Sequence, residues 1–463
     1  MTDLVLTSLR KTDEVARHLT SRGLSLDGAH SKAKLFARAA NALEAEGHGA
    51  ASPALACYVP GRIELLGKHT DYAGGRSLLL APERGFCIVA VPRTDATISI
   101  TSVSGGESTA FEFRPDLKPR EGHWSNYPIS VAARLALNFP GQRNGANMAL
   151  ESDLPAAAGM SSSSALVVAT YLALAAGNTF EQRPEFQQHI QSQEDLAGYL
   201  GTIENGQSFG SLAGARGVGT FGGSEDHTAI LCAAPGVLKQ FSFCPVHLER
   251  IIPLPGDYRF VIASSGVKAE KTGAAMEKYN RVSRLASAAL HLWQRSTRRH
   301  DRHLAAAIAS APDAVDRFRT ILTHETHDVF DARELLDRFE QFVMESEECI
   351  PAVADHLTDE TLSLFAKLAN RSQDRGAELL GNQVPETVYL AEAARRLGAV
   401  AASAFGAGFG GSVWALSRAE SADELLDRWR EDYRQTFPAP AERSLFFATV
   451  AGPGAFCLQS LET

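Results

Sequence analysis

Apolar side chains recur along this chain with two different spacings. In residues 31–46 and 127–138 they recur every three or four positions, which predicts helices that bury one face. Residues 56–67, 78–92 and 96–104 are instead short apolar or β-branched runs bounded by turn residues, which is typical of strands. Helices and strands are thus interspersed from the start of the chain, and the pattern predicts an α/β or α+β fold.

The two patterns continue through the rest of the chain. We predict further helices over 161–177 and 185–210, and strands over 147–155, 227–234, 238–243 and 258–266. Long helices are expected from there to about residue 398, followed by a short strand that leads into a glycine-rich turn.

Prolines and glycines gather between the predicted strands at 235–257, which indicates a change of domain. A chain of 463 residues is also long enough for two domains of roughly 200 residues each. We therefore predict an N-terminal arm over 1–30, an N-terminal domain over 31–244 and a C-terminal domain over 245–463.

The composition narrows the classes of function. The chain is 44% hydrophobic and 21% charged, with a net charge of −9, which is typical of a globular protein and unlike a nucleic-acid-binding surface. It has no apolar run of about 18 residues, so we expect no membrane span. The N-terminus lacks the apolar core of a signal peptide. We expect a cytoplasmic protein that binds small molecules, and the oligomeric state stays open.

The spacing of the cysteines is also consistent with a cytoplasmic protein. They are far apart and form no CxxC pair, so we expect reduced thiols with neither disulfide nor metal use. These residues are Cys57, Cys87, Cys232, Cys244, Cys349 and Cys457.

Three glycine-rich turns follow predicted strands or precede predicted helices. Their sequences are VPGRIELLGKHTDYAGG (59–75), DLPAAAGMSSSSALVVA (153–169) and AFGAGFGGSVWAL (404–416). The second turn precedes an apolar helix, whose free N–H groups and dipole favour a bound phosphate. A serine-capped helix without a ligand is the alternative. The groups expected at a phosphate belong to Gly159, Ser161, Ser162, Ser163 and Ser164.

These three motifs, in this order, resemble the signature motifs of the GHMP small-molecule kinases. The first one resembles the galactokinase branch in particular. For the third, the resemblance implies that Gly408 lies near the phosphates. The resemblance implies a fold of two α/β domains with the active site in the cleft between them, and a reaction that uses ATP with Mg²⁺. The second motif is not a Walker loop, because no Gly-Lys-Ser/Thr follows it.

The resemblance also implies the catalytic groups. Asp226, in GGSEDH, matches the aspartate beside the anomeric hydroxyl of the sugar, and Arg62 matches the arginine that stabilises the transferred phosphoryl group. Glu204 matches the magnesium ligand that faces a loop serine, which is Ser163 or its neighbour Ser162. His227 stands where the family has glutamine. Without the family, Asp226 could be an ordinary turn residue.

The sugar-binding residues implied by the resemblance are His69, Asp71 and Tyr279. Lys68 departs from the motif, because the family has a glutamate there that contacts the C6 end of the sugar, and Glu64 replaces an asparagine. One hypothesis is that Lys68 binds an acidic group at C6, as on galacturonate. The other is that Lys68 extends to solvent or pairs with Glu64, which leaves a galactose site.

We therefore predict a kinase that phosphorylates the anomeric hydroxyl of a hexose. Galactose is the first expected substrate and galacturonate the second. A sensor that binds sugar and ATP without turnover is a further alternative, because the galactokinase branch includes such proteins.

Overall fold

The computed structural model describes residues 4–120, 122–155, 157–269, 274–355 and 362–459. Its strands form three sheets, one of six strands in the order β14-β1-β4-β7-β5-β6 and two of four strands, β2-β3-β8-β9 and β11-β12-β10-β13. The strands are β1 (Leu55–Pro60), β2 (Ile63–Leu66), β3 (Arg76–Leu80), β4 (Gly85–Pro92), β5 (Thr97–Ser102), β6 (Glu107–Glu112), β7 (Ala146–Ser152), β8 (Val237–Ser242), β9 (His247–Pro253), β10 (Tyr258–Ser264), β11 (Ala401–Phe405), β12 (Ser412–Arg418), β13 (Leu445–Thr449) and β14 (Phe456–Cys457).

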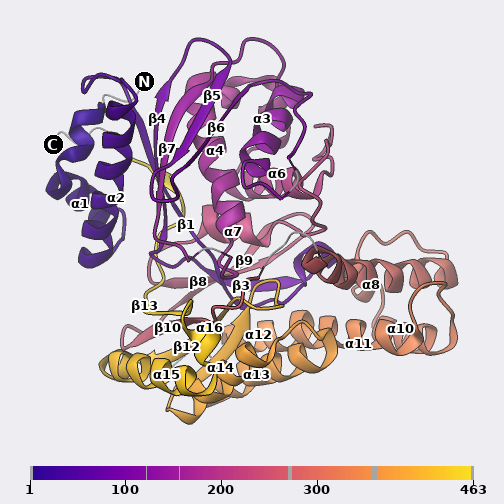
Figure 1. The fold of residues 1–463 in the computed structure, drawn as a ribbon. Coiled ribbons are helices and arrows are strands. Elements are labelled where there is room, and N and C mark those ends of the chain that lie inside the picture. The colour runs from indigo at the N-terminus through magenta and orange to yellow at the C-terminus, as the bar shows by residue number, and fades with distance from the viewer. Residues whose placement is uncertain (1–3, 121, 156, 270–273, 356–361, 460–463) are drawn as a thin grey trace.

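Helices cover these sheets and also extend away from them (Figure 1). They are α1 (Thr12–Ser21), α2 (Leu26–Ala45), α3 (Asn126–Asn138), α4 (Ser162–Asn178), α5 (Pro184–His189), α6 (Gln193–Asn205), α7 (Glu225–Cys232), α8 (Ala274–Thr297), α9 (Leu304–Ile308), α10 (Ala314–His324), α11 (Ala332–Phe342), α12 (Ile350–Asp355), α13 (Leu362–Arg375), α14 (Pro385–Arg396), α15 (Ala422–Thr436) and α16 (Pro438–Ala441). The mixture of helices and sheets confirms the predicted fold class.

The strands β1 and β4 of the six-stranded sheet are buried on both faces. Alternate residues of β1 belong to different cores: Cys57 and Val59 pack in the core shared with α4, whereas Ala56 and Tyr58 pack in the core shared with α1 and α2. Figure 1 shows α1 and α2 on one side of this sheet and α3, α4 and α6 on the other. Because side chains alternate along a strand, a strand covered on both faces is apolar throughout, as β1 is.

The N-terminal segment is part of this layer rather than a separate arm. Helix α2 runs without a break across the boundary that we predicted between residues 30 and 31. Its buried residues, such as Phe36 and Leu43, share a core with Leu19 of α1 and Val89 of β4. The two helices therefore cover one face of the six-stranded sheet.

The C-terminal sheet is covered by α14 and α15, which share a core with β10, β11 and β12. Helices α8 to α11 form a separate bundle that projects to one side of the molecule (Figure 1). The boundary expected near residue 245 falls in the turn between β8 and β9, two strands of one sheet. Within the described residues, no helix combines the length and apolar character needed to cross a bilayer.

The last strand returns to the N-terminal sheet. β14 pairs with β1, and Cys57 and Cys457 are direct cross-strand partners joined by a disulfide. The prediction that all six cysteines are reduced is therefore wrong. No local pattern indicates this bond, because the two residues are 400 positions apart and meet only through the sheet.

One predicted strand, 227–234, is also wrong. Residues Glu225–Cys232 form α7, a short helix with two acidic residues in its first turn. Acidic side chains near a helix N-terminus are stabilised by the helix dipole. The apolar run that follows them is too short to separate a buried helix from a buried strand by periodicity.

Candidate active site

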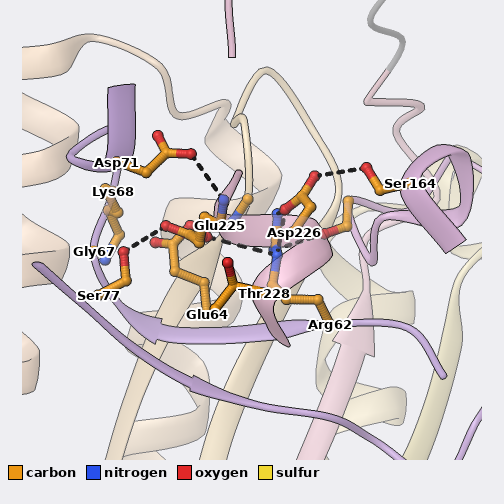
Figure 2. Close-up of polar contacts among 12 residues, drawn as sticks. Arg62, Glu64, Gly67, Lys68, Asp71, Ser77, Ser164, Glu225, Asp226 and Thr228 are labelled. Atoms are coloured by element: carbon orange, nitrogen blue, oxygen red, sulfur yellow. Dashed lines mark hydrogen bonds and ion pairs between the residues drawn. The ribbon is translucent and has the colours of Figure 1, made fainter. Parts of the chain in front are cut away.

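Arg62 lies at the meeting point of three segments. It follows β1 at the turn into β2, and its backbone N–H donates to the carbonyl of Met160 in the second glycine-rich turn. Its Nε donates to Asp226 Oδ1 at 2.7 Å (Figure 2). One of its Nη atoms donates to the carbonyl of Gly159 at 3.2 Å. Gly61 permits this contact, because a Cβ there would lie 2.8 Å from the Met160 carbonyl oxygen. The turn thus fixes Arg62 between the phosphate loop and Asp226.

The guanidinium of Arg62 is 3% exposed and faces two acidic side chains. Burial alone lowers its pKa, but Asp226 and Glu225 outweigh that effect and raise it. Glu225 Oε1 lies 3.7 Å from Arg62 Nε, whereas a second guanidinium nitrogen donates to Asp226. Arg62 is therefore charged and forms a buried ion pair with Asp226.

A serine hydroxyl links Asp226 to Glu204. Ser164 Oγ donates to Glu204 Oε1 at 2.6 Å and lies 3.4 Å from Asp226 Oδ2. His227 Nε2 lies 3.2 Å from the same Glu204 oxygen. The serine that contacts Glu204 is therefore Ser164. We had expected Ser163 or Ser162, the two preceding residues, at this position. Ser162 and Ser163 line a different cavity.

The phosphate loop has the backbone expected of an anion site. Gly159 and Ser161 adopt left-handed conformations, and α4 begins directly afterwards at Ser162. The hydroxyl of Ser161 is buried without a hydrogen-bond partner among the described residues. The loop adjoins a cavity of about 420 Å³ whose walls include Trp124, Tyr127 and Leu150. Gly408, from the third turn, contacts Asn382 instead and does not line this cavity.

A second cavity lies on the other side of Asp226. Its walls include three residues predicted to bind the sugar, His69, Asp71 and Tyr279. His69 contacts the hydroxyl of Tyr72 and the carbonyl of Ala407, each at 3.1 Å. Its free space is about 40 Å³, enough for a few water molecules.

Asp71 ties this cavity to α7. Its Oδ2 accepts from the backbone N–H of Glu225 at 3.1 Å, and its Oδ1 accepts from the N–H of Tyr72 at 2.8 Å. A Cβ at Gly223 would lie 2.4 Å from Asp71 Oδ2, so only glycine permits this approach. Asp71 therefore positions the first turn of α7, which carries Asp226.

Lys68 is turned away from this cavity. It is 1% exposed, and its Nζ donates to Ser372 Oγ and Ser403 Oγ, both at 2.9 Å. Glu345 Oε1 accepts from the same Ser372 hydroxyl at 2.9 Å and from the Gly67 N–H at 2.8 Å. The expected extension of Lys68 to solvent is therefore wrong, whereas its charge does act on the neighbouring Glu64, as the pairing hypothesis expected. A role as a sugar ligand stays a prediction that this geometry does not support. Lys68 is part of a buried polar network in the C-terminal domain.

Two buried carboxyl groups of the sugar cavity were not assigned roles from the sequence. Glu225 accepts from Ser77 Oγ at 2.7 Å, and Glu64 accepts from the Gly406 N–H at 3.3 Å. Burial raises the pKa of Glu225 well above its usual range, and the charge of Glu64 adds to this effect. Burial also raises the pKa of Glu64, to about 7. In the sequence, the only indication that Glu225 belongs to the site was its position next to Asp226.

The donor set near Ser164 suits Mg²⁺. Hydroxyl and carboxylate oxygens are its preferred ligands, and in kinases one or two carboxylates act together with substrate phosphates. Ser164, Glu204 and Asp226 offer such oxygens beside the phosphate loop. In the described part of the chain, no group of three or more His, Cys, Asp or Glu side chains forms a metal site by itself.

Comparisons with known proteins agree with this arrangement. Three family descriptions match the chain: the galactokinase galactose-binding signature at 45–92, the GHMP kinases N terminal domain at 126–211 and the GHMP kinases C terminal domain at 351–435. Galactokinase of Haemophilus influenzae is 25% identical over 389 residues, which are 83% of this chain and 90% of that protein. Galactokinase of Chloroflexus aggregans is 27% identical over 374 residues, covering 79% and 85%.

Solved structures share the fold. Lactococcus lactis galactokinase complexed with galactose superposes with a TM-score of 0.73 at 22% identity, covering 90% of this chain and 98% of that one. Methanococcus jannaschii mevalonate kinase has a TM-score of 0.53 at 14% identity, covering 86% and 98%. These likenesses confirm the two-domain GHMP kinase fold.

Proposed function

We propose that this chain, which is similar to galactokinases and matches the GHMP kinase domains, transfers the γ-phosphoryl group of ATP to the anomeric hydroxyl of galactose. The observation that carries the proposal is the position of Asp226. Its carboxylate is held by Arg62 between the phosphate loop and the cavity that contains His69 and Asp71. A hydroxyl in that cavity and a phosphoryl group at the loop would meet at Asp226.

The chemistry follows from this placement. Asp226 orients the sugar hydroxyl and accepts its proton, as phosphoryl transfer requires of a group beside the nucleophile. Arg62 forms an ion pair with Asp226 and stabilises the negative charge on the transferred group. Because Arg62 is buried, its electrostatic effect is stronger than it would be in water.

We place the nucleotide in the cavity of about 420 Å³ beside α4. The phosphates lie at Gly159 and the serines of the loop, where Ser161 Oγ is buried and has no partner among the described residues. The base lies beside Trp124, whose Nε1–H is likewise buried without an acceptor in the described part of the chain. Mg²⁺, held by Ser164 and Glu204, would neutralise charge on the phosphates.

The sugar-binding residues that remain are His69, Asp71 and Tyr279. Galactose is the first candidate, because the relatives that match most of the chain are galactokinases and the galactose-binding signature is present. Galacturonate becomes the weaker candidate. Its carboxylate would not be bound by Lys68, whose ammonium donates to Ser372 and Ser403 instead.

The test is ADP release with Mg-ATP against galactose, galacturonate, glucose, arabinose and N-acetylgalactosamine. We expect a preference for galactose over galacturonate and a product that no longer reduces copper, because its anomeric carbon is blocked. Asp226→Asn should abolish turnover and still bind a fluorescent ATP analogue. Wild-type rates in that variant would refute its role. ATP and sugar binding with no turnover on any sugar would favour a sensor.

A further inference from the structure

Helix α2 buries a charged side chain on the face that packs against the six-stranded sheet. Lys32 is 2% exposed, and its ammonium forms an ion pair with Asp153 Oδ2. Its neighbours on this face, such as Phe36 and Leu43, are apolar and already hold the helix on the sheet. Burying a lysine costs free energy, so an ion pair adds little stability over an apolar contact. One use of such a pair is to fix the position of one segment relative to another.

Asp153 is the first residue of the second glycine-rich turn, and it follows β7 directly. Its Oδ1 accepts from the Gly85 N–H at 2.9 Å, and its backbone carbonyl accepts from an Nη of Arg84 at 2.9 Å. The next residue, Leu154, lines the cavity of about 420 Å³ beside α4. A Cβ at Gly61 would lie 2.7 Å from Leu154 Cδ2, so this residue also touches the turn that carries Arg62. Asp153 therefore fixes the start of the segment that forms the phosphate loop.

A second polar contact joins the same end of α2 to this corner of the sheet. Ser25, which caps the N-terminus of α2, donates through Oγ to Glu83 Oε2 at 2.8 Å. Glu83 lies two residues before Gly85, the residue bound by Asp153. The family descriptions that match the chain begin at residue 45, the last residue of α2, so they assign no role to Lys32.

We propose that Lys32 is a positioning residue for ATP, which acts through Asp153 to hold the phosphate loop in the conformation that binds the nucleotide. The inference rests on the proposed kinase function. Backbone N–H groups bind phosphate only when they point at it, and a loop that is fixed beforehand loses less entropy on binding. Helix α4 fixes the far end of the loop, and the Lys32–Asp153 pair fixes its start. Lys32 lines neither the sugar cavity nor the nucleotide cavity, so it acts only through this contact.

The first test is the kinetics of Lys32→Met. We expect KM for ATP to rise about tenfold, which corresponds to ~1.4 kcal/mol of binding free energy, and kcat and KM for galactose to change less than about threefold. The effect is moderate because the charge of Arg84 also acts on Asp153. Asp153→Asn still accepts from Gly85 and should raise KM for ATP by a similar factor. The double variant should be no worse than either single variant, because each breaks the same contact.

The matched control is Arg38→Met, on the same helix. Arg38 forms an ion pair with Glu151 inside β7, whose backbone is already fixed by pairing with β4. This variant should lose stability, since it leaves a buried carboxylate without its partner, and should retain the wild-type KM for ATP. Equal increases in KM for ATP and for galactose in Lys32→Met, or additive effects of the Lys32 and Asp153 substitutions, would overturn the positioning role.

Hydrogen exchange of the wild-type protein gives a readout that requires no variant to fold. Coupling between two sites is reciprocal, so Mg²⁺ with a non-hydrolysable ATP analogue should slow the exchange of backbone amides in α2 around Lys32. Galactose alone should not. Slower exchange at the start of α4 with no change in α2 would overturn the inference and leave the kinase function standing. No effect of the nucleotide on either helix would overturn the kinase function together with the inference.

Discussion

The two ends of the candidate active site are built in different ways. The nucleotide end is a cavity of about 420 Å³ formed by backbone turns and apolar walls, whereas the sugar end leaves about 40 Å³ between charged side chains. A backbone cradle tolerates changes of side chain as long as the loop conformation survives. A set of buried charged side chains in contact with one another tolerates fewer substitutions, because each side chain affects the protonation and the position of its neighbours. The differences between this chain and its relatives should therefore act mainly at the sugar end.

The largest effect should come from Arg62, which joins the two ends. Arg62→Gln removes the cation that pairs with Asp226 and that faces the transferred phosphoryl group. We expect kcat to fall by about 10²–10⁴-fold, the range seen for electrostatic and acid–base groups. Steady-state kinetics with saturating ATP measures this loss.

Binding of ATP offers the matching control for Arg62→Gln. The phosphate loop retains its backbone N–H groups in this variant, so the affinity for an ATP analogue should change far less than kcat. Equal losses of kcat and of nucleotide affinity would mean that Arg62 maintains the conformation of the phosphate loop and does not act on the transferred phosphoryl group.

A second large effect should come from Lys68, as a loss of stability. Lys68→Met leaves Glu345 and Glu64 buried without their neighbouring cation. Removing one partner of a buried charge cluster costs about 3–5 kcal/mol, and we expect that fall in the free energy of unfolding. Urea denaturation measures it, with the exposed Lys34→Met as control. A stable variant with altered discrimination against galacturonate would restore Lys68 as a sugar ligand.

Lys68 also illustrates what the sequence could predict. The glycine-rich turns could be recognised because their residues lie close together in the chain. Arg62, His69, Asp71 and Asp226 were then assigned by the resemblance of these local motifs to those of the family. The direction of the Lys68 side chain depends on Ser372 and Ser403, which lie about three hundred residues further along. The same holds for the Cys57–Cys457 bond and for the choice of Ser164 at Glu204. Contacts between distant segments carry no local pattern, so they required the fold.

A smaller effect is the pH dependence contributed by Glu64. Burial raises its pKa from 4.5 to about 7, so the folded state holds a proton that the unfolded state has released between these pH values. Stability then falls as pH rises from 4.5 to 7, and this group contributes no further change above 7. We expect a loss on the order of 2 kcal/mol across that window.

The variant Glu64→Gln isolates this contribution. Its amide does not titrate, so its stability relative to wild type should increase from pH 5 to pH 7 and then level off. Denaturation at pH 5, 6, 7 and 8 follows the difference. A constant difference would show that Glu64 has an ordinary pKa, and that the buried charges of the sugar end do not affect its protonation.

The smallest effect should arise at the nucleotide end, from Trp124. Its indole lines the large cavity, stacks beside His123, and has a buried Nε1–H without an acceptor in the described part of the chain. Stacking of a base on an aromatic ring contributes about 1–3 kcal/mol, so Trp124→Ala should raise KM for ATP roughly tenfold. Trp124→Phe retains a ring but lacks the donor, and should raise it only a few-fold. Both variants should leave KM for the sugar unchanged, because the indole lies outside the sugar cavity. An equal change in KM for the sugar and for ATP would mean that binding at the two ends is coupled. The structural difference between the two ends would then not correspond to independent binding of sugar and nucleotide.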